Sequence, residues 1–247
     1  MTERLQKILA QAGICSRRKA EAHIQAGRVA VDGIKVTEQG LKVDPQRQTI
    51  TFDGRKISSE KKIYLLLNKP KGYVTTLHDP QKRPIVSSLL KGVSDRVFPV
   101  GRLDIDTEGA LLLTNDGDLS FRVLHPSYEV KKTYQATVKG RLSRQTLQPL
   151  EEGIVLEGKK TWPAKLEILQ ENKDETVVKI IIHEGRKRQV RKMFAAVGHP
   201  VLSLQRLAYG GLQLGQLPTG SFRILDAKDI DKIFSDNKFL YKRKKHI

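Results

Sequence analysis

The chain has 247 residues, of which 45 are Lys or Arg and 27 are Asp or Glu, so its net charge is +18 near neutral pH. A chain this basic is expected to bind a polyanion, although a basic protein with merely solvated Lys side chains stays an alternative. The hydrophobic content of 38% predicts a soluble globular protein, and no apolar run approaches the roughly 20 residues that a membrane span needs.

The cysteine and histidine content argues against two further classes of protein. Cys15 is the single cysteine, which excludes an internal disulfide and suits a reducing compartment. The six scattered histidines give no metal-ligand spacing. The first residues have neither the apolar core nor the cleavage site of a signal peptide. We therefore expect a cytoplasmic protein that holds no metal and does not bind a membrane.

Residues 1–60 are predicted to form a small α+β module. Two short helices are expected within residues 2–27, the first capped by Thr2 and the second by Ser16. The second helix carries Arg17, Arg18 and Lys19 in its first turn, where the helix dipole disfavours each cation by a few tenths of a kcal/mol or more. Neutralisation by phosphate groups would explain this cluster, and a solvated charged helix end is the alternative.

The same module contains two turn signals. The Asp-Gly pair at residues 32–33 suits a type I′ turn between short apolar strands at residues 29–31 and 34–36. A second Asp-Gly pair follows another apolar stretch, at residues 53–54. These signals predict β-hairpins that accompany the two helices.

Beyond a polar linker at residues 58–62, the chain is rich in extended segments. Those expected are residues 63–67, 73–76, 132–139 and 176–182, with a turn at residues 68–72. The segment 132–139 alternates, so that Tyr134, Ala136 and Val138 share one face. Taken alone, Tyr134 is more typical of a core residue than of a functional one.

A helix is expected after Gly185. Its inward face consists of Val190, Met193, Phe194 and Val197, and Gly198 and Pro200 close it. Residues 63–235 therefore predict a mixed, mostly antiparallel β-sheet with flanking helices, and residues 236–247 a basic tail. Together with the N-terminal module, the fold class is α+β.

An acidic loop precedes the apolar run at residues 110–113. If the loop is extended, Arg102, Asp104 and Asp106 share a face and Leu103 points to the other side. An Arg beside an Asp can hold the carboxylate ionised, and such a carboxylate in a protected cleft can serve as nucleophile or general base. By itself, however, Arg-x-Asp is more typical of a turn or a surface ion pair.

Five cations occupy the predicted start of the last helix, namely Arg186, Lys187, Arg188, Arg191 and Lys192. Helical geometry places Arg188 and Lys192 opposite the apolar stripe, where they would meet phosphate. Lys187 and Arg191 flank the edge of the stripe, from which an Arg can reach a carboxylate at the rim of the core. A plain basic face is the alternative.

The chain resembles the pseudouridine synthases, in the branch that acts on ribosomal RNA. The motifs that carry the resemblance are Gly101-Arg102-Leu103-Asp104 with Thr107 and Gly109, residues 111–117 (LLLTNDG), 67–72 (LNKPKG), 131–134 (KKTY) and 184–193 (EGRKRQVRKM). Residues 3–50 resemble the small RNA-binding module first known from a ribosomal protein, the S-four domain. The two resemblances together span nearly the whole chain.

The resemblance implies a role for several residues. Asp104 matches the catalytic aspartate, Tyr134 the aromatic residue that packs against the uracil, and Arg191 the basic residue paired with the aspartate. Arg102 matches the Arg that helps to fill the duplex after the target uridine swings out. One departure is Ala110, where Leu often follows the Gly, and this change is conservative in a buried strand.

The implied reaction breaks the N-glycosidic bond of uridine, rotates the base and re-attaches it through carbon, with no cofactor. Whether Asp104 attacks the sugar, adds to the base or removes a sugar proton stays open.

The implied partner is ribosomal RNA. The N-terminal module, the full-length match and the basic tail most resemble members that act on 23S ribosomal RNA or a large-subunit assembly intermediate. A 16S ribosomal RNA enzyme, or one acting on an adjacent large-subunit uridine, is the alternative within the family. A non-catalytic assembly factor and an RNA glycosidase or nuclease are the alternatives outside it. A monomer is expected, because an asymmetric ribosomal substrate offers no symmetry to match.

Overall fold

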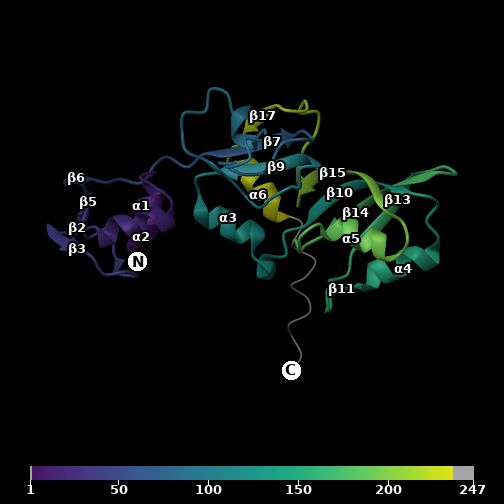
Figure 1. Ribbon diagram of the computed structural model, residues 1–247, viewed down its shortest axis with the longest axis horizontal. Coiled ribbons are helices and arrows are strands. Elements are labelled where there is room, and N and C mark those ends of the chain that lie inside the picture. The colour runs from purple at the N-terminus through teal and green to yellow at the C-terminus, as the bar shows by residue number, and fades with distance from the viewer. Residues whose placement is uncertain (1, 236–247) are drawn as a thin grey trace. The chain divides into compact units, whose positions relative to one another are not determined.

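The computed structural model describes residues 2–235, which fall into two compact units (Figure 1). The first unit comprises residues up to 62 together with 115–117, and the second comprises residues 63–114 together with those from 118 onward. The basic tail predicted at residues 236–247 lies outside the described residues.

The first unit is a small α+β fold. Its elements are β1 (Glu3–Arg4), α1 (Leu5–Gln11), α2 (Arg17–Gln25), β2 (Val29–Val31), β3 (Ile34–Val36), β4 (Lys42–Val43), β5 (Ile50–Phe52) and β6 (Arg55–Lys56). Four strands pair in the order β3-β2-β5-β6, and β1 pairs with β4. The predicted hairpin is confirmed, since Val31 pairs with Ile34 and both residues of the Asp32-Gly33 turn have positive φ, at 50° and 82°.

The two helix starts differ in outcome. Ser16 caps α2 as predicted, because its hydroxyl accepts a hydrogen bond from the Lys19 amide at 3.3 Å. The predicted Thr2 cap is wrong: α1 begins at Leu5, after Arg4 as N-cap residue, with no side-chain cap. The preceding residues Glu3 and Arg4 instead pair with β4, which moves the helix start along the chain.

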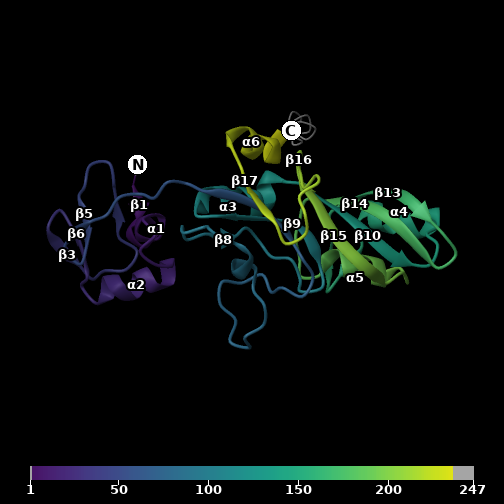
Figure 2. The same cartoon turned by 90° about the horizontal axis from the view of Figure 1, so that it is seen from above.

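The second unit is built on a nine-stranded sheet. Its strands are β7 (Tyr64–Lys69), β8 (Phe98–Pro99), β9 (Glu108–Thr114), β10 (Lys132–Lys139), β13 (Lys165–Glu171), β14 (Glu175–Ile182), β15 (Val201–Tyr209), β16 (Leu212–Gln213) and β17 (Phe222–Ile224). The main path is β13-β14-β10-β15-β9-β7-β17 (Figure 1), and its part from β13 to β9 can also be followed in Figure 2. Every neighbouring pair on it is antiparallel except β15 and β9, which confirms the predicted mixed, mostly antiparallel sheet.

Helices and short hairpins complete this unit. They are the 3₁₀ turns η1 (Val86–Leu89) and η2 (Pro126–Tyr128), the helices α3 (Gly117–Leu124), α4 (Arg144–Glu152), α5 (Gln189–Ala196) and α6 (Ala227–Ser235), and the strand pair β11 (Val155–Leu156) and β12 (Lys159–Lys160). The extended segment expected at residues 73–76 is wrong, because only an isolated bridge joins Val74 to Ile85 there.

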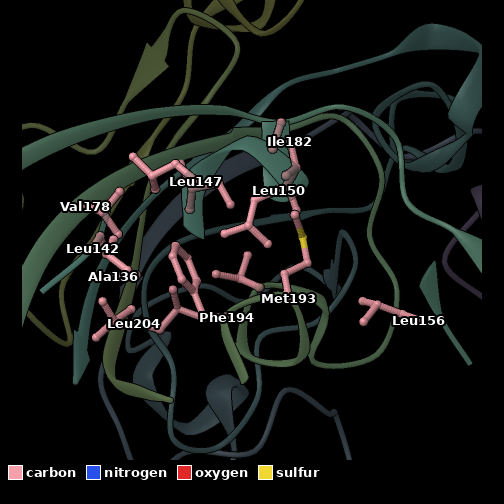
Figure 3. Packing of buried hydrophobic residues seen from close by; sticks show 14 residues of the cluster. Ala136, Leu142, Leu147, Leu150, Leu156, Val178, Ile182, Met193, Phe194 and Leu204 are labelled. Carbon is pink, nitrogen blue, oxygen red and sulfur yellow. The ribbon is translucent and has the colours of Figure 1, made fainter. Parts of the chain in front are cut away.

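Helix α5 packs against β10, β14 and β15 through a buried apolar cluster (Figure 3). Val190, Met193 and Phe194 are all buried in it, as the apolar stripe predicted. The helix nevertheless begins at Gln189, after Arg188 in the left-handed conformation with φ 53°. Arg186, Lys187 and Arg188 therefore precede the helix, and the helical placement expected for these cations is wrong.

The parallel pairing of β9 with β15 requires a glycine. Gly109 has φ 102°, and a Cβ atom there would lie 2.3 Å from the carbonyl oxygen of Arg206. Because no side chain intervenes, the backbones of the two strands approach closely, with Arg206 opposite Gly109. This contact brings the acidic loop before β9 to the same part of the sheet as β15.

Candidate active site

Apolar and polar contacts within the protein fix the acidic loop at residues 101–107. Leu103 is buried in the cluster formed by one face of β7 and β9. Its amide and carbonyl both bond the hydroxyl of Thr75, at 3.2 and 2.7 Å. Thr107 donates its amide to the carbonyl of Asp104 at 3.1 Å, which closes a turn. The loop is therefore not extended, and Asp104 and Asp106 do not share a strand face.

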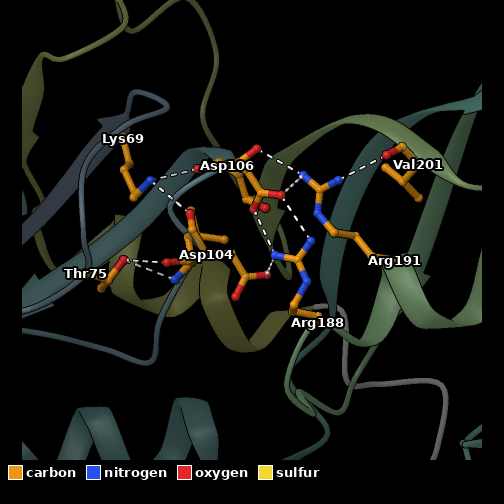
Figure 4. Close-up of polar contacts among 9 residues, drawn as sticks. Lys69, Thr75, Asp104, Asp106, Arg188, Arg191 and Val201 are labelled. Atoms are coloured by element: carbon orange, nitrogen blue, oxygen red, sulfur yellow. Dashed lines mark hydrogen bonds and ion pairs between the residues drawn. The ribbon is translucent and has the colours of Figure 1, made fainter.

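Lys69, the last residue of β7, supports this turn from inside the protein. It has no exposed surface, and its Nζ donates to the carbonyl oxygens of Pro70 at 3.0 Å, Asp104 at 3.1 Å and Thr107 at 2.8 Å. Burial lowers the pKa of Lys69 to about 8, although the carboxylates of Asp104 and Asp106 oppose this shift. Lys69 thus holds the backbone of Asp104 in place without touching its carboxylate (Figure 4).

The carboxylate of Asp104 remains accessible. Its side chain is 35% exposed, and among the described residues it pairs with Arg188, whose Nη1 lies 3.8 Å from Oδ2. This distance describes a loose ion pair, so the oxygens of Asp104 stay available to a substrate.

Asp106 rather than Asp104 takes the strong ion pairs. Arg188 donates to both of its carboxylate oxygens at 3.1 Å. Arg191 places Nη2 3.3 Å from Oδ2 of Asp106 and 3.0 Å from its carbonyl oxygen, while its Nη1 donates to Val201 O at 3.1 Å (Figure 4). Burial opposes ionisation of Asp106, but these two guanidinium groups outweigh it and lower the pKa of Asp106.

The expected direct pair between Asp104 and Arg191 is therefore not the one that forms. The turn at residues 104–107 presents Asp106 to Arg191, and Arg188 bridges the two carboxylates. Burial lowers the pKa of Arg191, against the attraction of Asp106 and Asp104. Arg188, which was expected to face phosphate, is instead engaged by acidic residues, and the hydrogen bonds that it donates to Asp106 raise its pKa.

Asp104 borders a cavity of about 590 Å³. Residues that line it include Arg102, Asp104, Lys132, Tyr134, Arg188 and Arg206. The cavity thus collects the side chains of the acidic loop, of β10, of the segment before α5 and of β15. Its volume lies within the range of small-molecule sites, which accommodates a nucleoside.

The other predicted RNA contacts fall into two groups. Arg17, Arg18 and Lys19 are exposed on the first turn of α2, and Lys187 and Arg102 are exposed in the second unit. The remaining two cations are engaged within the protein: Arg186 bonds Glu184 and the carbonyls of Lys159 and Lys160, and Lys192 pairs with Glu157 at 2.6 Å. An RNA ligand would have to compete with these contacts.

Sequence reasoning missed three buried cations of the site. Lys69 stands in a Lys-Pro-Lys-Gly stretch that was expected to turn, Lys132 is the first residue of the strand expected at residues 132–139, and Arg206 lies in a segment for which no element was expected. All three are less than 7% exposed. Lys and Arg are almost never fully buried without a specific partner, and a sequence alone carries no signal for such burial.

Residues 2–235 lack two further kinds of feature. This part of the chain holds no group of three or more His, Cys, Asp or Glu side chains placed to bind a metal ion. None of its helices combines the length and apolar character that crossing a bilayer requires.

Comparisons with known proteins agree with each other. Residues 63–196 match the family described as RNA pseudouridylate synthase, and residues 3–48 match the S4 domain. The chain is 46% identical to "Ribosomal large subunit pseudouridine synthase B" of Bacillus subtilis, covering 94% of this chain and 95% of the relative. It is 42% identical to an uncharacterized RNA pseudouridine synthase of Aquifex aeolicus, over 95% of this chain and 94% of that one. A crystal structure titled as a pseudouridylate synthase superposes with a TM-score of 0.68 at 33% identity, covering 93% and 99% of the two chains.

Proposed function

Because the chain belongs to the RNA pseudouridylate synthase family, we propose that it converts uridine to pseudouridine in large-subunit ribosomal RNA with Asp104 as the catalytic carboxylate. The enzyme class follows from the family. The assignment of Asp104 is supported by one observation above all: its accessible carboxylate borders the cavity that Tyr134 also lines.

The reaction needs the target base outside its stack. Flipping costs a few kcal/mol, and the vacated place must be filled or tolerated. Arg102 is exposed, lines the cavity and is proposed to fill the place that the flipped base leaves in the RNA. Tyr134 supplies an aromatic surface inside the cavity, against which the uracil would stack. Asp104 then acts on the sugar or the base at the glycosidic bond.

The carboxylate must keep its position during this chemistry. Lys69 and Thr75 fix the backbone around Asp104, while Asp106 occupies the two guanidinium groups that would otherwise bind the catalytic oxygens tightly. Arg191 is on this account a positioning residue, because it acts through Asp106. Pre-positioned groups of this kind lower the barrier by avoiding reorganisation.

Binding of the RNA is proposed to involve both units. Residues 1–60 would be the RNA-binding domain, with Arg17, Arg18 and Lys19 as phosphate contacts, and residues 63–235 the catalytic domain. The match to the S4 domain and the exposure of these three cations support this division. We further propose 23S ribosomal RNA or a large-subunit assembly intermediate as substrate, a monomeric enzyme, a cytoplasmic location and no metal.

Mapping of pseudouridines in ribosomal RNA from cells with and without the gene tests the substrate. The proposal predicts that at least one pseudouridine disappears from 23S ribosomal RNA and returns with the wild-type gene. Loss confined to 16S ribosomal RNA would move the substrate to the small subunit. An unchanged map of both RNAs would contradict the proposed function.

A further inference from the structure

Arg206 is a buried cation whose hydrogen-bonding capacity is only partly used. It is 4% exposed in the centre of β15. Its Nε donates to the carbonyl of Ala110 at 2.7 Å, its Nη1 lies 3.4 Å from the hydroxyl of Tyr134, and its guanidinium carbon lies 4.4 Å from the centroid of the Tyr209 ring. Its Nη2 is buried and has no hydrogen-bond partner among the described residues. Such an orphaned charged donor is costly unless a ligand completes it.

No carboxylate forms an ion pair with Arg206 within residues 2–235. Arg206 forms no ion pair there, and neither does Lys132, which lines the same cavity and donates its Nζ to His183 O at 3.1 Å. Burial, together with the charge of Arg206, lowers the pKa of Lys132 to about 8. Two carboxylates, those of Asp104 and Glu184, also line the cavity, but six Lys and Arg side chains line it with them. This excess of cations gives the cavity a positive potential, which favours an anionic occupant.

The proposed reaction generates such an anion by each of its possible routes. If the glycosidic bond breaks first, its electron pair stays on N1 and the charge spreads over the two uracil oxygens. If Asp104 adds to the ring, the charge moves to a carbonyl oxygen of the base instead. In either case no oxidant or further reactant enters, and a donor aimed at a uracil oxygen stabilises the intermediate.

We propose that Arg206 is a catalytic residue whose free Nη2 donates a hydrogen bond to a carbonyl oxygen of the flipped uracil and stabilises the negative charge on the base. This inference rests on the proposed function. Asp104 and Arg206 then have complementary roles: the carboxylate acts at the glycosidic bond, and the guanidinium stabilises the negative charge that develops on the base. Tyr134, whose hydroxyl contacts Arg206, orients the guanidinium in addition to stacking on the uracil ring.

A purely structural role for Arg206 predicts a different pattern of effects. Arg206 also ties β15 to β9 through Ala110, so Arg206→Met lowers activity on either account. Sulfur accepts hydrogen bonds more weakly than oxygen does. RNA with 2-thiouridine or 4-thiouridine at the mapped target therefore weakens the hydrogen bond to one carbonyl position of the base at a time. In the wild type, the contacted position is expected to slow single-turnover isomerisation about tenfold when it carries sulfur.

The thermodynamic cycle between protein and base decides the question. Arg206→Met is expected to react about 100-fold more slowly on uridine, with RNA affinity unchanged. It is also expected to lose the sulfur penalty, that is, the slowing of the reaction when sulfur replaces the contacted uracil oxygen. Arg206→Lys keeps a charge without the guanidinium fork, and the penalty is expected to shrink there as well. Arg122→Met is the matched control, because Arg122 lies over Phe234 at 4.1 Å outside the cavity; its rates and its sulfur penalty stay at the wild-type values.

Three results would overturn the inference: a sulfur penalty that persists in full in Arg206→Met or Arg206→Lys, a wild type that treats all three bases alike, or an Arg206→Met enzyme with the wild-type rate. A wild-type protein that leaves the uridine target unmodified would instead contradict the proposed function.

Discussion

Replacing Lys69 with Met tests how the protein holds the carboxylate of Asp104, which is proposed to be catalytic. The substitution keeps an unbranched side chain of similar length but removes the cation that bonds three carbonyl oxygens, those of Pro70, Asp104 and Thr107. The carbonyls of Asp104 and Thr107 belong to the turn on which the carboxylate is mounted. Without Lys69 they lose their buried donor, and the turn is free to shift.

The expected cost follows from these contacts. Hydrogen bonds to a charged group contribute about 1.5–3 kcal/mol each, so the three together contribute roughly 5–9 kcal/mol. The pKa of Lys69, lowered to about 8 from 10.5, corresponds to a net cost of about 3 kcal/mol for holding the cation in this site, after the attraction of nearby carboxylates is included. We therefore expect Lys69→Met to lose roughly 2–6 kcal/mol of stability. A displacement of Asp104 by about 1 Å would lower the rate about 100-fold.

Urea unfolding at neutral pH and single-turnover pseudouridine formation measure the two effects. Lys71→Met is the matched control, because Lys71 lies two residues further on, is 49% exposed and, within residues 2–235, pairs only with Glu108, at 3.7 Å. It should differ from the wild type by less than about 0.5 kcal/mol. A Lys69→Met protein with the stability and rate of Lys71→Met would refute the positioning role of Lys69.

Three further predictions concern the ion pairs, the RNA contacts and the pH dependence. Asp106→Asn removes the charge shared by two guanidinium groups. Since the Asp106 side chain is 43% exposed, we expect the free energy of unfolding, measured by thermal unfolding, to fall by only about 1 kcal/mol, but turnover to fall roughly tenfold. Unchanged turnover would contradict the positioning role of Asp106. The double change Arg17→Glu and Arg18→Glu should weaken RNA affinity and reduce the slope of log affinity against log salt concentration by about two, while the rate at saturating RNA stays the same. An unaltered affinity would indicate that these cations form a solvated helix end. Because the pKa of Lys132 is about 8 in the native chain and 10.5 ordinarily, the unfolded chain binds more protons in that window and the free energy of unfolding rises with pH there. In Lys132→Met this rise should be smaller by up to about 3 kcal/mol in urea titrations near pH 7 and near pH 10, whereas an identical rise in both proteins would contradict the lowered pKa.

Local patterns predicted the elements whose structure depends on nearby residues. The alternation at Lys132–Lys139 coincides with β10, and the Asp32-Gly33 turn forms as expected because its positive φ angles suit that pair. The buried stripe of α5 was likewise evident from its spacing. Each of these signals lies within a few residues of the element that it specifies.

Features that depend on distant segments were not evident. The pairing of Arg191 with Asp106 arises because the turn at residues 104–107 rotates the acidic side chains relative to each other, which an extended loop would not do. The burial of Lys69 and Arg206 depends on carbonyl oxygens supplied by other strands and loops. A Lys or Arg in a sequence is ordinarily read as exposed, and only the assembled sheet shows that these two are not.

The most direct test of the whole account is pseudouridine formation by Asp104→Asn in purified 23S ribosomal RNA, measured beside the wild type under single-turnover conditions. Asn keeps the size of the side chain but removes its charge and its basicity. We expect the variant to fold and to bind the RNA with nearly the wild-type affinity but to form no pseudouridine. Turnover by Asp104→Asn at a rate near that of the wild type would contradict the central claim.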